Sequence, residues 1–216
     1  MKKAILFDLD GTLWDSGETV LPAWNAVLAD AGVRAPLTMD ELNSFMGLGP
    51  QDLADRMLPT LPTPEERLAL FTKCFDAEVV AIRAHGAVLY EGLLDMLTAL
   101  KGKGLFLAVV SNCKDGYIQA FLDYYQLHEI FTDFESAGAT GLTKGENIAL
   151  VLARNGFAAA DALYVGDTVW DMEASTKAGV DFLHAAYGFG SVPEGTPKVS
   201  CPKEITMWID VQCKGE

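Results

Sequence analysis

Hydrophobic and polar positions follow two different patterns along this 216-residue chain, and the change comes near residue 86. Between residues 16 and 86 the apolar side chains recur at helical spacing, and no strand-like run interrupts them. After residue 86, continuous apolar runs alternate with amphipathic segments, a pattern typical of a parallel sheet covered by helices on both faces. Strands are predicted at residues 4–7, 105–110, 131–134, 162–165 and 180–184, and the later helices at 91–102, 115–126, 145–154 and 168–178.

Capping signals divide the helical part of the chain. Gly32 ends a first helix, and the capping box over residues 38–41 begins a second that stops near Gly47. Another capping box, Thr63-Pro64-Glu65-Glu66, has proline at the first helical position and begins a long helix towards Ala84. The chain length allows one large domain or a core with a smaller insert. We therefore predict a core domain of residues 1–15 and 87–216 and a helical insert of residues 16–86.

Composition narrows the possible partners. The formal net charge is −14, and nucleic acids and anionic lipids bind through basic patches, so neither is expected as the main partner. The four cysteines are scattered without a CxxC pair, which favours reduced thiols. The first apolar run is too short for a signal-peptide core, and none approaches the ~20 apolar residues of a membrane helix. We expect a soluble, cytoplasmic protein with no membrane partner, and no pattern indicates its oligomeric state.

Two aspartates one residue apart, Asp8 and Asp10, follow the first predicted strand, and Gly11 then allows a sharp turn. Side chains at alternate strand positions point to the same side, so both carboxylates emerge where the strand ends. Two such charges about 4 Å apart repel by roughly 4 kcal/mol at an effective dielectric near 20. A bound cation, or a proton held by one acid, would relieve this repulsion.

Polar residues follow two other predicted strands: Ser111 and Asn112 after one, Gly166 and Asp167 after another. The ligand crevice of a parallel α/β sheet lies beyond the carboxyl ends of its strands. Asp171 would lie one helical turn after Asp167, on the same side. The aspartates together would need a hard cation, and Mg²⁺ fits because it takes few carboxylates, keeps water ligands and contacts phosphate. Asp167 taken alone could instead cap a helix.

Two further candidates have ordinary alternatives. Lys144 precedes a predicted helix and, on local sequence alone, is a surface lysine; its place between the second and third strand ends also suggests a phosphate or carboxylate partner. Ser111 could cap a helix, or its hydroxyl and the amides behind it could bind an anion.

Together these residues resemble the haloacid dehalogenase-like superfamily of phosphohydrolases, whose four motifs match in order over nearly the whole chain. Residues 8–13 are similar to the first motif, Ser111 to the second, Lys144 to the third, and Gly166-Asp167 with Asp171 to the fourth. Many relatives have proline after the third-motif lysine, whereas glycine follows here, so Lys144 is assigned by position. The resemblance implies a Rossmann-like, doubly wound parallel sheet core with an inserted all-helical cap domain.

The resemblance also implies a phosphoric monoester hydrolase in which Asp8 attacks phosphorus and becomes an aspartyl-phosphate. Asp10 would protonate the leaving alcohol and then activate water. Mg²⁺ would be held by the Asp8 carboxylate, the Asp10 main-chain carbonyl and Asp167, with Asp171 acting through water or as a further ligand. The phosphate-binding groups implied are Ser111, the amides of Leu9 and Asn112, and Lys144.

Within the superfamily, similarity is closest to phosphoglycolate phosphatase-like members, and the substrate is expected to be a small phosphate monoester, either phosphoglycolate-like or a sugar phosphate. The cap loop containing Met46, Gly47 and Leu48 is expected to influence substrate choice, although it could be a plain helix-ending loop. One alternative is a beta-phosphoglucomutase-like phosphomutase, which is disfavoured because Val20, Met46 and Pro50 appear where the mutases carry histidine and basic residues. Another is a non-catalytic phosphate- and metal-binding regulatory module, which the intact Asp10 disfavours.

Overall fold

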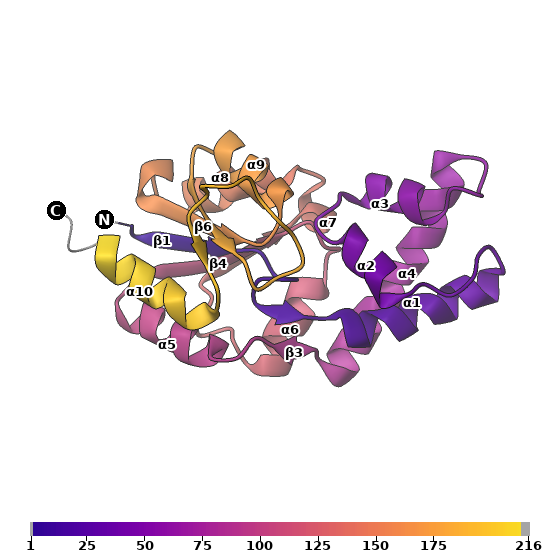
Figure 1. The fold of residues 1–216 in the computed structure, drawn as a ribbon, viewed down its shortest axis with the longest axis horizontal. Coiled ribbons are helices and arrows are strands. Elements are labelled where there is room, and N and C mark those ends of the chain that lie inside the picture. The colour runs from indigo at the N-terminus through magenta and orange to yellow at the C-terminus, as the bar shows by residue number, and fades with distance from the viewer. Residues whose placement is uncertain (1, 213–216) are drawn as a thin grey trace.

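A computed structural model describes residues 2–212 and contains a six-stranded parallel sheet in the order β5-β4-β1-β6-β7-β8 (Figure 1). The central strand β1 pairs with β4 and β6 so that Phe7 lies beside Val109 and Val165. The carboxyl ends of these three strands are therefore level. The strands are β1 Ala4–Phe7, β4 Phe106–Ser111, β5 Asp133–Ser136, β6 Ala162–Gly166, β7 Asp181–Ala185 and β8 Lys198–Val199.

Helices cover both faces of the sheet, so alternate strand residues are buried in two separate clusters. On one face Ile5 and Phe7 pack with side chains of α5 (Leu93–Gly102), α6 (Tyr117–Tyr125) and α10 (Pro202–Gln212). On the other face Ala4 and Leu6 pack with side chains of α8 (Lys144–Arg154) and α9 (Val169–Lys177). This arrangement confirms the predicted α/β fold class. Two short elements, α7 (Ala137–Thr140) and the 3₁₀ turn Ala159–Asp161, complete the core.

Four helices, which we call the cap helices, interrupt the chain and lie to one side of the sheet (Figure 1). They are α1 Gly17–Ala31, α2 Met39–Phe45, α3 Pro50–Met57 and α4 Pro64–His85. Both predicted capping boxes are present, at Thr38 and at Thr63. Where the chain leaves and re-enters the core, β2 (Trp14–Asp15) and β3 (Val88–Leu89) form an antiparallel ribbon. The domain boundaries proposed from the sequence fall beside this ribbon and stay a prediction.

Several local predictions were wrong or incomplete. The strand predicted at 131–134 begins at Asp133, because Phe131 is buried in the core before the strand and packs edge-on against Phe7. The sequence reading missed α3, whose apolar residues are few, and the elements after residue 190, β8 and α10. Within residues 2–212 no helix is both long and apolar enough to cross a membrane. Cys74, Cys113 and Cys201 are free thiols, while Cys213 lies outside the described residues.

Candidate active site

The level strand ends bring residues from three distant parts of the sequence to one edge of the sheet. Asp8 directly follows β1 and donates its backbone N–H to the carbonyl of Val165, at a distance of 2.9 Å. Ser111 ends β4 and Asp167 directly follows β6, so both lie at the same edge as Asp8. All three side chains are buried. This arrangement is consistent with the prediction that the polar residues following these strands lie close together.

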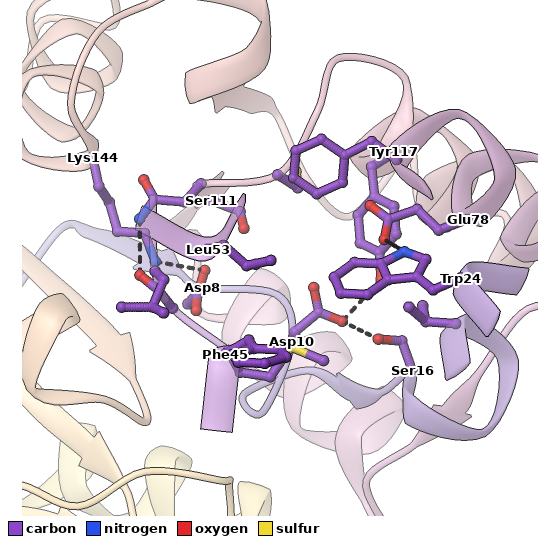
Figure 2. Close-up of a pocket in the computed structure, with 17 residues that line it drawn as sticks. Asp8, Asp10, Ser16, Trp24, Phe45, Leu53, Glu78, Ser111, Tyr117 and Lys144 are labelled. Carbon is purple, nitrogen blue, oxygen red and sulfur yellow. Dashed lines mark hydrogen bonds and ion pairs between the residues drawn. The ribbon is translucent and has the colours of Figure 1, made fainter. Parts of the chain in front are cut away.

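Lys144 joins two of the aspartates. Its Nζ lies 3.0 Å from Asp8 Oδ1 and 2.6 Å from Asp171 Oδ1, and all three side chains are at most 5% exposed. A lysine this deeply buried is stable only when it is paired, so the surface alternative does not apply. Burial alone would lower the pKa of the Lys144 ammonium, but Asp171 and Asp8 outweigh that effect and raise it. Lys144 therefore stays charged beside Asp8 (Figure 2).

The helix-capping alternative applies to a different aspartate from the one expected. Thr168, not Asp167, is the N-cap of α9, and Asp171 completes the capping box by accepting hydrogen bonds from Thr168 N and Oγ1. With Oδ2 in the cap and Oδ1 on Lys144, both oxygens of Asp171 have partners. Gly116 is the N-cap of α6, so Ser111 is not a cap either.

Asp167 is held by the loop after β7. Its Oδ2 accepts hydrogen bonds from the backbone N–H groups of Phe189, at 2.8 Å, and Gly190, at 3.3 Å. The ring of His184 contacts the Asp167 carbonyl oxygen at 3.0 Å. Gly11 has a φ of +79°, and a Cβ there would overlap the Asp167 carboxylate. The glycine after the Asp-x-Asp pair therefore provides both the turn and the space that Asp167 occupies.

The carboxylates of Asp8, Asp167 and Asp171 can hold a divalent cation together. Each offers an oxygen within 4.8 Å of the others, and Asp167 Oδ1 is buried without a hydrogen-bond donor among the described residues. In the absence of a metal, burial and the neighbouring Asp171 raise the pKa of Asp8 to about 7 and raise that of Asp167 well above its usual range. The unpartnered oxygen of Asp167, close to a carboxylate oxygen of Asp8, fits a hard cation such as Mg²⁺.

Asp10 has a different environment from Asp8, although the two are neighbours in sequence. Its Oδ1 accepts hydrogen bonds from Trp14 Nε1, at 2.9 Å, from Tyr117 OH, at 3.0 Å, and from Ser16 Oγ. Burial raises the pKa of Asp10, and these three donors partly offset that increase. Asp10 is thereby held in a fixed position on the side of the site that faces the cap helices (Figure 2).

Sequence reasoning missed these three donors as site residues. Trp14 packs edge-on against Phe121, with ring centroids 4.8 Å apart, and its indole N–H also holds Asp10. The positions of Trp14 and Ser16, within six residues of Asp10, were an available signal. Tyr117 comes from α6, more than 100 residues away, and no local pattern identifies it.

The phosphate-binding candidates lie around Asp8. Ser111 and Asn112 line the pocket shown in Figure 2 together with Asp8 and Lys144. Within residues 2–212 the backbone N–H groups of Leu9 and Asn112 donate no hydrogen bond to another backbone carbonyl. A hydroxyl and an ammonium that line the same pocket, together with backbone N–H groups that follow the ends of β1 and β4, are groups suited to binding an anion.

The cap loop closes this pocket. Met46, Gly47 and Leu48 all line it, and the Gly47 carbonyl accepts a hydrogen bond from Asn112 Nδ2 at 3.1 Å. Gly47 has a φ of +82°, and a Cβ there would lie 3.1 Å from atoms of Thr168 and Trp170. The loop between α2 and α3 therefore contacts residues that follow both β4 and β6.

Comparison with known proteins gives concordant results. The family model described as haloacid dehalogenase-like hydrolase matches residues 5–185. A phosphoglycolate phosphatase from Psychrobacter arcticus is 30% identical over 200 residues, which cover 87% of this chain and 85% of that protein. A crystal structure of a predicted phosphoglycolate phosphatase from Haemophilus somnus has a TM-score of 0.83 and 22% identity, covering 96% of this chain and 98% of that one. The structure of CbbY from Rhodobacter sphaeroides in complex with phosphate has a TM-score of 0.80 and 23% identity, covering 95% and 96% of the two chains.

These matches confirm the predicted superfamily resemblance and enzyme class. The matched region begins in the strand before Asp8 and ends in β7, so it contains every motif on which the resemblance rested. The chain belongs to the haloacid dehalogenase-like hydrolase family.

Proposed function

We propose that the protein is a Mg²⁺-dependent phosphatase that hydrolyses a small phosphate monoester through an aspartyl-phosphate on Asp8. The observation that carries the proposal is the separation of two neighbouring carboxylates into two environments. Asp8 lies beside a buried ammonium and a second aspartate, whereas Asp10 is fixed by three neutral donors on the cap side. Carboxylates placed in such different surroundings are typical of a division between nucleophile and acid–base roles.

The proposed reaction has two displacement steps. A carboxylate oxygen of Asp8 attacks phosphorus, the bond from phosphorus to the ester oxygen breaks, and Asp10 gives its proton to the leaving alcohol. Asp10 then accepts a proton from water, whose oxygen attacks the aspartyl-phosphate, and inorganic phosphate leaves with Asp8 restored. The raised pKa of Asp10 suits the first step, because an acid must hold its proton until the ester oxygen needs it.

The residues for charge compensation are also available. Asp8 and Asp167, with the Asp10 main-chain carbonyl, would hold Mg²⁺, which when bound supplies charge neutralisation for the phosphoryl oxygens. Asp171, whose two oxygens are already engaged by Thr168 and Lys144, would act mainly by positioning Lys144 or through water. Ser111, Lys144 and the amides of Leu9 and Asn112 would bind phosphoryl oxygens during both steps.

A substrate with one phosphate group is favoured over a substrate with two. Lys144 is the only lysine, arginine or histidine among the described residues that line the pocket, and it is already paired with two aspartates. A phosphomutase would have to bind a second phosphate at the cap end without any cation there. The curated relatives named phosphoglycolate phosphatase act on a small phosphate ester according to their name, which supports the same substrate size.

Replacement of the nucleophile tests the proposal directly. Asp8→Asn should abolish turnover of an aryl phosphate with Mg²⁺ present, while Asp95→Asn, an exposed substitution of the same kind on α5, should leave turnover unchanged. Rapid acid quenching followed by mass spectrometry should locate a phosphoryl group on Asp8 of the wild type. Retained turnover in Asp8→Asn would refute the mechanism. Failure of the wild type to hydrolyse any member of a broad phosphate panel would favour a non-catalytic binding module instead.

A further inference from the structure

The pocket has two chemically different ends. Figure 2 shows Asp8, Ser111 and Lys144 at one end and Trp24 and Glu78 at the other, with Asp10 between them. If Asp10 protonates the leaving oxygen, as the proposed function requires, the phosphoryl group occupies the first end. The rest of the substrate must then occupy the second end, beside α1 and α4.

The second end is apolar except for one ionisable side chain. Apolar cap side chains line the pocket, namely those of Val20, Trp24, Phe45, Leu53 and Phe75, and Trp24 lies beside Glu78 at the second end (Figure 2). Glu78 on α4 lies among them and is only 4% exposed. Apart from Tyr117 and Ser16, which are engaged by Asp10, Glu78 is the polar side chain available to a leaving group at this end.

Glu78 is incompletely paired. Its Oε2 accepts a hydrogen bond from Trp24 Nε1 at 2.7 Å, and within residues 2–212 the structure gives this carboxyl group no salt bridge. Lys114, whose charge acts to lower the pKa of Glu78, does not line the pocket and is paired with Asp76 instead. Burial and the nearby Asp10 raise the pKa of Glu78 well above its usual range, as expected for an acid with no cationic partner.

We propose that Glu78, held by Trp24, forms a subsite that prefers a leaving group bearing a primary amine and disfavours one bearing a carboxylate. An ammonium group would favour the charged form of Glu78 and pair with it, because this carboxyl group has no salt bridge among the described residues. A carboxylate would instead bring into the same buried space a charge that no lysine, arginine or histidine at this end of the pocket can pair, since Lys144 lies at the other end. Hydroxyl-bearing leaving groups are intermediate, because they donate a hydrogen bond but bring no charge.

Three phosphate esters of nearly equal size distinguish these cases: 2-aminoethyl phosphate, 2-hydroxyethyl phosphate and phosphoglycolate. The wild type with Mg²⁺ should show the highest kcat/KM for the amine and the lowest for the carboxylate. In Glu78→Gln the amine-to-hydroxyl ratio of kcat/KM should fall by about tenfold, the size of one lost hydrogen bond between charged groups. The loss should appear mainly in KM, because the subsite contacts the leaving group away from phosphorus.

Controls separate this inference from the proposed function on which it rests. The amine-to-hydroxyl ratio of kcat/KM within one variant is unaffected by a general loss of activity. Glu65→Gln is the same substitution at an exposed position of α4, and it should leave this ratio at the wild-type value. Wild-type turnover of an aryl phosphate tests the phosphatase function by itself. If the aryl phosphate is hydrolysed but phosphoglycolate matches or exceeds the amine, the subsite proposal fails while the function stands. Because the wild-type order is decisive alone, the proposal stays testable even if Glu78→Gln does not fold.

Discussion

Lys144 Nζ lies 2.6 Å from Asp171 Oδ1, and this buried contact links the helix after β6 to the nucleophile candidate, because the same ammonium also contacts Asp8. Asp171 is in turn fixed by the capping box at the start of α9. A helix-capping interaction therefore positions the lysine beside Asp8. We infer that Asp171 serves the site through Lys144.

Removal of this ammonium should strongly destabilise the protein. Lys144→Met leaves Asp8 and Asp171 buried without their cation, and breaking a buried pair costs about 3–5 kcal/mol. Urea unfolding of the metal-free protein measures the change. Lys103→Met is the matched control, because its ion pair with Asp210 is exposed and should contribute less than about 1 kcal/mol. Equal losses in the two variants would contradict the structural role of Lys144.

Asp10→Asn should separate the two steps of the reaction. Alkyl phosphates, whose leaving group needs a proton, should lose about 10²- to 10⁴-fold in kcat. An aryl phosphate has a better leaving group, so it should still phosphorylate Asp8 and then stall, because no base activates water. Stopped-flow measurement of aryl alcohol release should show a burst equal to the enzyme concentration. Equal impairment of both substrates without a burst would argue against the acid–base role.

Gly11→Ala tests whether the position of the Asp167 carboxylate beside Gly11 is needed for Mg²⁺ binding. An added Cβ would overlap the Asp167 carboxylate, so the variant should lose both activity and the increase in thermal midpoint that we expect Mg²⁺ to give the wild type. Gly156→Ala is the control, because Gly156 has a similar φ of +75° but no atom near the added Cβ. Both variants carry the cost of a left-handed alanine, about 1–2 kcal/mol, and only Gly11→Ala should lose Mg²⁺ binding. A normal Mg²⁺ response in Gly11→Ala would exclude Asp167 as a ligand.

The stability of Glu78→Gln relative to the wild type should depend on pH. The folded protein raises the pKa of Glu78 above its usual 4.5, through burial and Asp10, and these effects outweigh the opposing ones of Trp24 and Lys114. The neutral acid is therefore the form that folding favours, and the wild type loses stability as pH rises from 4.5 through the folded pKa. Glutamine stays neutral, so the free energy of unfolding of the variant, minus that of the wild type, should increase with pH.

Urea unfolding at a series of pH values between about 4 and 8, in the absence of metal, measures this difference. Glutamine can still accept the Trp24 hydrogen bond, so the comparison isolates the charge. A difference that does not change with pH would mean that Glu78 is not buried as an unpaired acid in the folded state.

Most of the helices and strands and the candidate chemistry could be predicted from the amino-acid sequence alone, although α3, β8 and α10 could not. Short continuous apolar runs that alternate with amphipathic segments favour strands covered on both faces, and capping boxes at Thr38 and Thr63 fix helix starts through local hydrogen bonds. The Asp8 and Asp10 pair, Ser111 and Asp167 could be placed at strand ends because each directly follows an apolar run. These are interactions between residues close in the chain, which a local pattern can reveal.

Which of these residues lie together, and which other residues support them, depends on the tertiary structure. Lys144 looks like a surface lysine in its own sequence, and becomes a buried partner of Asp8 because α8 and α9 pack on one face of the sheet. Tyr117 reaches Asp10, and Glu78 reaches the pocket, because α6 and the cap helices close over the other side. Such contacts depend on the packing of elements far apart in the chain, and burial then sets the charge and pKa of each group, so the local sequence cannot determine them.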